Sequence, residues 1–156
     1  MASAGLNKKQ EGETLVLEDF LPYRISILSN RISRAIAQRY ARAFKLTIPE
    51  WRVIAVLGRP SELTATQVAE ATEMDKVAVS RAVARLIQAR RVAASPDPND
   101  ARRQRLSLAP AGVNLHAKIA PIALACERRL VASLSARERA TLDGLIDRLL
   151  VSAKML

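Results

Sequence analysis

Apolar residues recur at helical spacing near the start of the chain. From Leu21 to Phe44 one wide face is apolar, and Asp19 and Pro22 suit the start of a helix there. The apolar residues on this face are Leu21, Ile25, Leu28, Ile32, Ala35, Ile36 and Ala43. The pattern predicts a long amphipathic helix.

Two further helices are predicted at the other end of the chain. The first begins at Pro110 and runs to about Leu134, with Pro121 as a kink inside it. Ser135 and Glu138 have the spacing of a capping box, so a last helix follows them. Its apolar stripe comprises Leu142, Leu145, Ile146, Leu149 and Leu150. Packing within one chain would explain such stripes, but helices at both ends exceed what a small core needs, which favours pairing between two chains.

Between these ends the sequence predicts two short helices joined by a tight turn. Thr64 and Gln67 form another capping-box pattern, which opens a helix that ends at Thr72. Asp75 can cap a following helix that runs to about Ala89. We expect Val68, Ala69 and Ala71 to point inward from the first helix, and Val79, Ala82, Val83 and Leu86 from the second. The opposite face of the second helix carries Val77, Ala78, Arg81, Ala84, Arg85 and Gln88, so the pair is typical of a helix-turn-helix.

The next segment has the pattern of a β-hairpin. Residues 92–95 and 105–108 predict two short strands, and Pro96, Pro98 and Asn99 are turn formers at the tip. The tip carries three arginines, namely Arg102, Arg103 and Arg105. A solvated loop would explain this segment alone, but after a helix-turn-helix it predicts a hairpin that enters a groove and meets phosphates.

The charge of the chain is concentrated over these motifs. The net charge of the 156 residues is +10. Residues 76–105 contain Lys76, Arg81, Arg85, Arg90, Arg91, Arg102, Arg103 and Arg105 against only Asp97 and Asp100, which predicts a polyanionic partner. A membrane surface is disfavoured because this block lacks bulky aromatic residues. The sequence shows neither an apolar run of about 18 residues nor a signal peptide, so we expect a soluble, cytoplasmic protein.

Three segments resemble the MarR family of bacterial winged helix-turn-helix regulators. Residues 46–57 are similar to its second helix, residues 74–86 to its recognition helix, and residues 97–103 to its wing motif D-P-x-D-x-R. The resemblance implies a mainly α-helical fold with a small β-hairpin wing, an α+β winged helix-turn-helix with terminal dimerisation helices. It also implies that Arg102 reaches into the minor groove and that Asp100 orients it.

The chain departs from the family pattern at three positions. Arg90 stands where a glycine usually ends the recognition helix, so a left-handed cap there costs more. Ser95 replaces a common arginine, and Ala109 replaces the threonine expected to cap the helix after the wing. The last two changes weaken the expected phosphate anchoring and wing stability.

The recognition helix and the wing together supply the predicted DNA contacts. Arginine can read guanine in the major groove, and Val or Ala can pack on a thymine methyl group. Lys76, in the first turn, is better placed for a phosphate than for a base. The predicted contacts are Lys76, Val77, Ala78, Ser80, Arg81, Arg85, Asp100, Arg102, Arg103 and Arg105.

The sequence predicts no enzyme, no metal site and no cofactor. His116 has no acidic or cysteine neighbour at ligand spacing, and we expect it at the surface or in a dimer interface. A phosphate-binding glycine loop and a nucleophile elbow are both absent from the sequence. The single cysteine, Cys126, lies in an apolar helical stretch and predicts a reducing compartment and a buried thiol, with redox sensing as the alternative.

We expect a flexible tail over residues 1–14 and a single domain over residues 15–156. Within this domain the winged region covers about 46–109, and the dimerisation helices cover 18–45 and 110–156.

These features predict a homodimeric, sequence-specific DNA-binding transcriptional regulator. The proposed mode is a repressor that leaves a pseudo-palindromic operator when a small-molecule effector binds. The resemblance implies a ligand pocket between the winged domain and the dimer interface. Ser29 and Trp51 are its candidate lining residues, with a helix-crossing contact and a core position as their alternatives. A basic helical adaptor that binds an acidic protein is the alternative function.

Overall fold

The computed structural model describes residues 14–59 and 62–156. The tail predicted over residues 1–14 lies outside the described residues, except for Thr14. The chain divides into two units, one that ends at Ser33 and one that spans Arg34–Leu156. The predicted helix-turn-helix and wing belong to the second unit.

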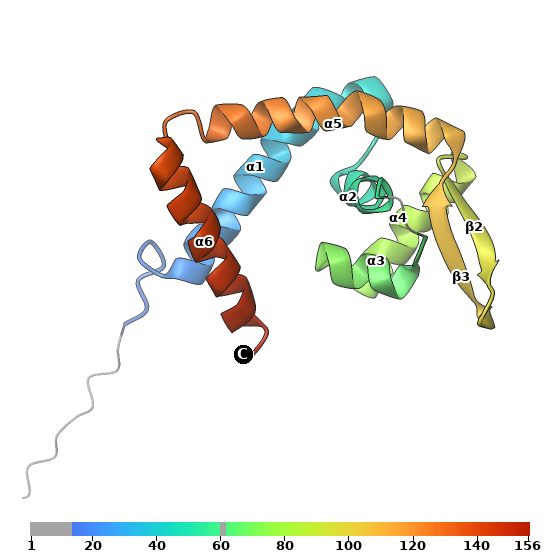
Figure 1. The fold of residues 1–156 in the computed structure, drawn as a ribbon, viewed down its shortest axis with the longest axis horizontal. Coiled ribbons are helices and arrows are strands. Elements are labelled where there is room, and N and C mark those ends of the chain that lie inside the picture. Colours follow the sequence, from blue (N-terminus) through green and yellow to red (C-terminus); the bar gives the residue numbers. More distant parts are fainter. Residues whose placement is uncertain (1–13, 60–61) are drawn as a thin grey trace, which may run out of the picture. The chain divides into compact units, whose positions relative to one another are not determined.

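The described residues are mainly helical, with a three-stranded antiparallel sheet. In chain order the elements are α1 (Leu21–Phe44), α2 (Ile48–Leu57), β1 (Leu63–Thr64), α3 (Ala65–Thr72), α4 (Lys76–Gln88), β2 (Val92–Asp97), β3 (Asp100–Leu108), α5 (Pro110–Leu130) and α6 (Ala136–Ala153) (Figure 1). The strand order is β1–β3–β2. This architecture confirms the predicted fold class, a winged helix-turn-helix with helices before and after it.

Hydrogen bonds at the caps confirm the predicted starts of α3, α4 and α6. The backbone N–H of Thr64 donates to Gln67 Oε1 over 2.9 Å, and that of Ser135 donates to Glu138 Oε2 over 2.8 Å. Asp75 Oδ1 accepts a 2.8 Å hydrogen bond from the backbone N–H three residues on. Each contact satisfies a backbone amide that has no partner within its helix.

The wing strands are longer than the sequence pattern predicted. Both extend toward the tip, so that only Pro98 and Asn99 separate β2 from β3. Residues 102–104 of β3 are exposed, so the sequence there lacks the apolar alternation that predicts a strand. β3 still includes them, because main-chain hydrogen bonds do not depend on side-chain polarity. β1 was not predicted at all; it adds a short edge to β3, with Leu63 opposite Leu106.

The predicted end of the helix before Ser135 was also wrong. α5 ends at Leu130 rather than near Leu134, and the backbone N–H of Leu134 donates to the Val131 carbonyl over 3.0 Å in a turn. As the N-cap of α6, Ser135 adopts an extended backbone with φ −65° and ψ 161°. The residues between Leu130 and Ser135 therefore connect α5 to α6 and do not continue α5.

The core of the second unit packs α2, α3 and α4 against the sheet and parts of α1 and α5. Its buried apolar residues are Tyr40, Leu46, Val53, Ile54, Leu57, Val68, Ala69, Val79, Ala82, Val83, Leu86, Val92, Leu106, Leu115 and Ile119. The predicted inner face of α4 is therefore confirmed. Ala71, expected to point inward from α3, is exposed. Burial raises the pKa of Tyr40 to about 12.

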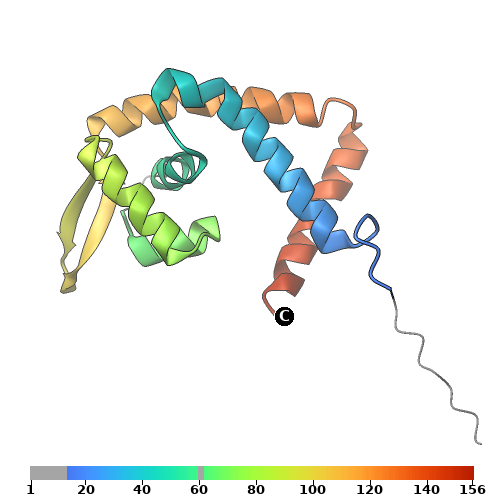
Figure 2. The same ribbon diagram turned by 180° about the vertical axis from the view of Figure 1, so that it is seen from behind.

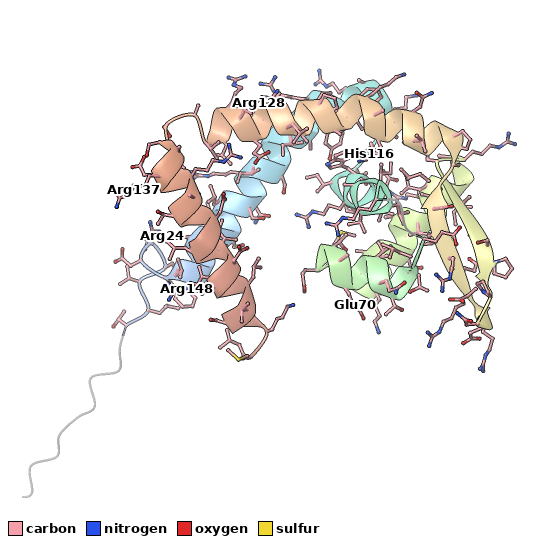
Figure 3. All side chains as sticks on the ribbon, viewed as in Figure 1. Arg24, Glu70, His116, Arg128, Arg137 and Arg148 are labelled. Carbon is pink, nitrogen blue, oxygen red and sulfur yellow. The ribbon has the colours of Figure 1, made fainter. Side chains whose placement is uncertain are left out.

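Three rings in contact connect α1, α2 and α5. The ring centroids of Tyr40 and Trp51 are 5.8 Å apart, and those of Trp51 and His116 are 6.0 Å apart. His116 reaches from α5 toward α2, where a Cβ atom at Gly58 would lie 2.4 Å from its Nε2 (Figure 3). His116 is half-buried, and its ring packs on Trp51 and beside the end of α2, while its expected place in a dimer interface stays a prediction.

Candidate nucleic-acid interface

The outward face of α4 carries the predicted recognition residues. Its inner residues anchor the helix in the core, and the Asp75 cap fixes its first turn. Lys76, Val77, Ser80, Arg81 and Arg85 are exposed, while Ala78 is half-buried. The long and basic side chains are therefore accessible to a partner along the whole helix.

The hairpin of β2 and β3 projects to one side of α3 and α4 in both ribbon views (Figure 1, Figure 2). At its tip, Asp100 Oδ1 accepts hydrogen bonds from the backbone N–H of Arg102 at 3.1 Å and from its Nε at 3.3 Å. Arg103 Nε lies 3.4 Å from Asp100 Oδ2. The predicted pair of Asp100 and Arg102 is thus in contact, and one carboxylate holds two guanidinium groups. Those side chains are 94% and 70% exposed.

Arg105 differs from the two arginines at the tip. Its Nε lies 3.3 Å from Asp97 Oδ2, and its side chain is only 32% exposed. The Asp97 side chain is 7% exposed, and its Oδ1 accepts a 2.9 Å hydrogen bond from the backbone N–H of Asn99. This hydrogen bond and the Arg105 charge hold the pKa of Asp97 below its usual value. Asp97 is therefore an ionised carboxylate at the inner end of the turn.

A groove of about 1030 Å³ lies between the start of α3, α4 and the wing. Its lining residues are Thr64, Ala65, Thr66, Gln67, Glu70, Ser80, Val83, Ala84, Ile87, Asp97, Asn99, Asp100, Arg102, Arg103, Gln104, Arg105 and Leu106. The groove brings together Ser80, Asp100, Arg102, Arg103 and Arg105 among the predicted contacts. The other predicted contacts lie on α4 but do not line it.

Sequence reasoning missed the contribution of α3 to this groove. The Thr64 cap places the first turn of α3 on the groove wall, and Gln67 and Glu70 follow on the same helix. A helix N-terminus attracts anions through its free amides and its dipole. The capping box was the available signal, because it marks where such an N-terminus begins. The groove thus combines a helix N-terminus with arginine side chains, a combination that suits phosphate groups.

The two candidate ligand-pocket residues have different surroundings. Trp51 is half-buried and packs between Tyr40 and His116, which agrees with its alternative as a core residue. Ser29 is exposed and belongs to the first unit. Their role in a ligand pocket stays a prediction.

Cys126 is half-buried rather than buried as expected. It lines a cavity of about 260 Å³ together with Arg39, Pro121, Ile122, Ala125 and Arg129. Within residues 14–59 and 62–156, no cluster of three His, Cys, Asp or Glu side chains is arranged to hold a metal ion. None of the helices in that part of the chain is long and apolar enough to cross a membrane.

Comparison with known proteins identifies the winged segment. Residues 44–103 match the model of the MarR family. No curated protein matches the chain. These matched residues contain α2, α3, α4 and most of the wing.

Solved structures share the fold over most of the chain. A MarR/EmrR family transcriptional regulator from Acinetobacter sp. ADP1 has 22% identity and a TM-score of 0.83, covering 91% of this chain and 100% of that one. MepR of S. aureus, solved as a DNA complex, has 21% identity and a TM-score of 0.77, covering 86% and 98%. BpsR of Bordetella bronchiseptica, whose DNA binding is regulated by 6-hydroxynicotinic acid, has 22% identity and a TM-score of 0.76, covering 87% and 96%.

The family match, the winged fold and the basic outward face of α4 agree with one another. Members of the matched family are regulators of transcription and not enzymes. Residues 44–103 match the MarR family of winged helix-turn-helix transcriptional regulators, and most of the chain shares the fold of solved structures from that family.

Proposed function

We propose that two copies of this chain bind a pseudo-palindromic operator in a sequence-specific manner and repress transcription there. The observation that carries the proposal is the groove between α4 and the wing, which is lined by wing arginines and lies beside the exposed arginines of α4. A two-fold dimer places one such groove over each half-site, so the half-sites lie about one helical turn apart, roughly 34–36 Å.

In this proposal the exposed face of α4 reads bases in the major groove. Arg81 and Arg85 are one turn apart and exposed, and each can form a bidentate contact with guanine. Val77, which is 58% exposed in the first turn, can pack on a thymine methyl group. Ala78 and Ser80 permit close approach, and Lys76 neutralises a phosphate.

The wing enters the neighbouring minor groove. Arg102 is the reading side chain, because it is the more exposed of the two arginines that Asp100 holds. Arg103 contacts the phosphates beside it. Minor-groove readout distinguishes A·T from G·C pairs but little more, so the wing sets a preference in the flanks of the operator.

Exposed apolar side chains supply the proposed dimer interface. α6 has no buried residue, and Leu145, Ile146 and Leu149 are exposed on it. In the first unit, Leu21, Ile25 and Leu28 are exposed on α1. A second copy that covers these residues would remove large apolar patches from water. We therefore assign residues 18–45 and 110–156 to dimerisation and about 46–109 to DNA binding.

A small-molecule effector would act by stabilising a conformation whose helix spacing misfits the operator. The similarity to BpsR, whose DNA binding is regulated by 6-hydroxynicotinic acid, supports this part of the proposal. Trp51 and Ser29 remain the candidates for contact with the effector. Since bacterial DNA lies in the cytoplasm, the proposed function also implies a cytoplasmic protein.

Selection of duplexes from a random-sequence library tests the operator. The wild type should enrich an inverted repeat. The Arg81→Ala variant should enrich the same repeat, but its discrimination between bases at one position per half-site should fall by about 1–3 kcal/mol. Arg128→Ala, on an exposed face of α5 (Figure 3), is the control and should select as the wild type does. Recovery of unenriched duplexes by the wild type would contradict sequence-specific binding.

A further inference from the structure

We propose that Arg105 is a positioning residue that sets the wing through Asp97, rather than a side chain that contacts DNA. The proposal rests on the proposed contact between the wing and the minor groove. It changes the role first expected for Arg105, and it assigns a function to Asp97, whose charge repels a polyanion.

The contacts of Arg105 point into the wing. Its Nη2 lies 3.5 Å from Asp97 Oδ1 and its Nε lies 3.3 Å from Oδ2, so both nitrogens face one carboxylate. The Nε atom is buried and has no hydrogen-bond partner among the described residues, so its contact with Oδ2 is an ion pair, while Nη2 donates a hydrogen bond to Oδ1. With its side chain 32% exposed, Arg105 offers a phosphate much less of its surface than Arg102 or Arg103 does.

The backbone of Arg105 lies where the three strands meet. It is opposite Ser95 on β2 and opposite Thr64 on β1. Thr64 is also the N-cap residue of α3. Arg105 therefore lies at the junction between the wing and the helix-turn-helix, two pairs away from the tip.

Asp97 connects this junction to the tip. The register of β2 and β3 shifts between Pro96 and Asp97, so main-chain pairing alone does not fix the tip there. Asp97 instead binds the backbone N–H of Asn99 on one side and faces Arg105 on the other. The ion pair thereby links the turn that precedes Asp100, and with it the Arg102 side chain, to the centre of the sheet.

The direction in which the Asp97→Asn substitution changes DNA affinity distinguishes the two possible roles of Arg105. If Arg105 contacts phosphate on its own, Asp97→Asn removes a negative charge near DNA and should leave affinity unchanged or raise it. If Arg105 acts through Asp97, the same substitution frees the tip and should lower affinity. The probe is a duplex selected by the wild-type protein, with binding measured at several salt concentrations.

We expect Asp97→Asn and Arg105→Gln each to weaken binding about tenfold, and the double variant to weaken it no more than either single variant. Unchanged or raised affinity of Asp97→Asn, or losses that multiply in the double variant, would overturn the proposal. Thermal unfolding of each variant shows that it is folded at the binding temperature. Should Arg105→Gln not fold, the sign of the Asp97→Asn effect decides alone.

A second readout distinguishes positioning from simple loss of stability. Arg102→Ala should cost about tenfold or more in affinity in the wild type, but less than about threefold in the Asp97→Asn background, because the tip is already displaced. An equal cost in both backgrounds would contradict positioning. A negligible cost in the wild type would instead contradict the proposed contact of the wing with DNA, so the two failures are distinguishable.

Discussion

Gly112 lies where the first turn of α5 approaches the chain before β2. A Cβ atom built at this glycine would lie 2.0 Å from the backbone oxygen of Arg91, and that oxygen also accepts a 3.0 Å hydrogen bond from the backbone N–H of Ala109. Because this oxygen belongs to the backbone, it cannot move away by a rotamer change as a side-chain atom could. The position therefore requires glycine although its φ is ordinary.

We predict that Gly112→Ala lowers the free energy of unfolding by about 1–3 kcal/mol or more, since overpacking forces the backbone to shift. Gly144→Ala is the matched control. A Cβ atom at Gly144 meets nothing within 4 Å on α6, so alanine should stabilise that helix by about 0.5–1 kcal/mol. Chemical denaturation of the two variants checks the prediction, and equal effects would contradict the close approach.

Asp97 should make the stability of the protein depend on pH in the acid range. Its pKa in the folded chain is below the ordinary value, so its contribution is fully present above the unfolded pKa of about 3.9 and is lost as pH falls through the folded value. The difference in Tm between the wild type and Asp97→Asn should therefore be largest above about pH 5 and shrink toward pH 3. Asp147→Asn, at an exposed position on α6, controls for general acid destabilisation. A difference that is constant with pH would show that the carboxylate charge is not involved.

At the level of elements, α4 ends without the glycine that its cap geometry favours. The backbone N–H of Arg90 donates to the Ile87 carbonyl at 2.9 Å, and that of Arg91 donates to the Leu86 carbonyl at 2.8 Å. This pair of hydrogen bonds is a Schellman motif, which requires a left-handed residue, and Arg90 has φ 55°. The cost expected from the sequence is thus present in the structure.

We predict that Arg90→Gly stabilises the protein by about 1 kcal/mol, because glycine adopts this conformation without steric cost. Arg90→Ala is the control, since it removes the same charge but keeps a Cβ atom, and it should not stabilise. Thermal unfolding of both variants gives the answer. Equal stability of the two variants would mean that the arginine charge, not the backbone, sets the effect.

The helices of the motif could be predicted because local signals mark them. Capping residues such as Thr64 and Asp75 act within one turn, and apolar spacing reveals the buried face of α4. β1 has only two residues, which is too short for any periodicity. Asp97 pairs with Arg105 across the β2–β3 hairpin, and two charges eight positions apart in the sequence do not reveal this contact before the strand register is known. The groove was partly predicted, because its wing residues were identified while its α3 wall was not.

In the whole molecule, the proposed DNA binding requires a second copy of the chain. Ile25→Glu together with Leu149→Glu should place unpaired charges in the proposed apolar interface, which is expected to bury well over about 1,000 Å². We predict that this variant becomes monomeric or unfolds, and that its DNA affinity falls sharply because one winged domain reads only half a site. Glu substitution at Arg24 and Arg148, which are exposed charged residues on the same helices, is the control and should leave the dimer intact. Sedimentation velocity reports the result, and an unchanged mass for the Ile25 and Leu149 variant would place the interface elsewhere.

The most direct test of sequence-specific binding by a dimer is sedimentation of the wild type with a labelled palindromic duplex that it has selected. The proposed function predicts two chains per duplex and weaker binding to a scrambled duplex of equal length. It also predicts a fall in affinity of about 10³-fold or more between about 50 and 200 mM salt for six or more phosphate contacts. One chain on a full palindrome, or equal affinity for the scrambled duplex, would contradict it.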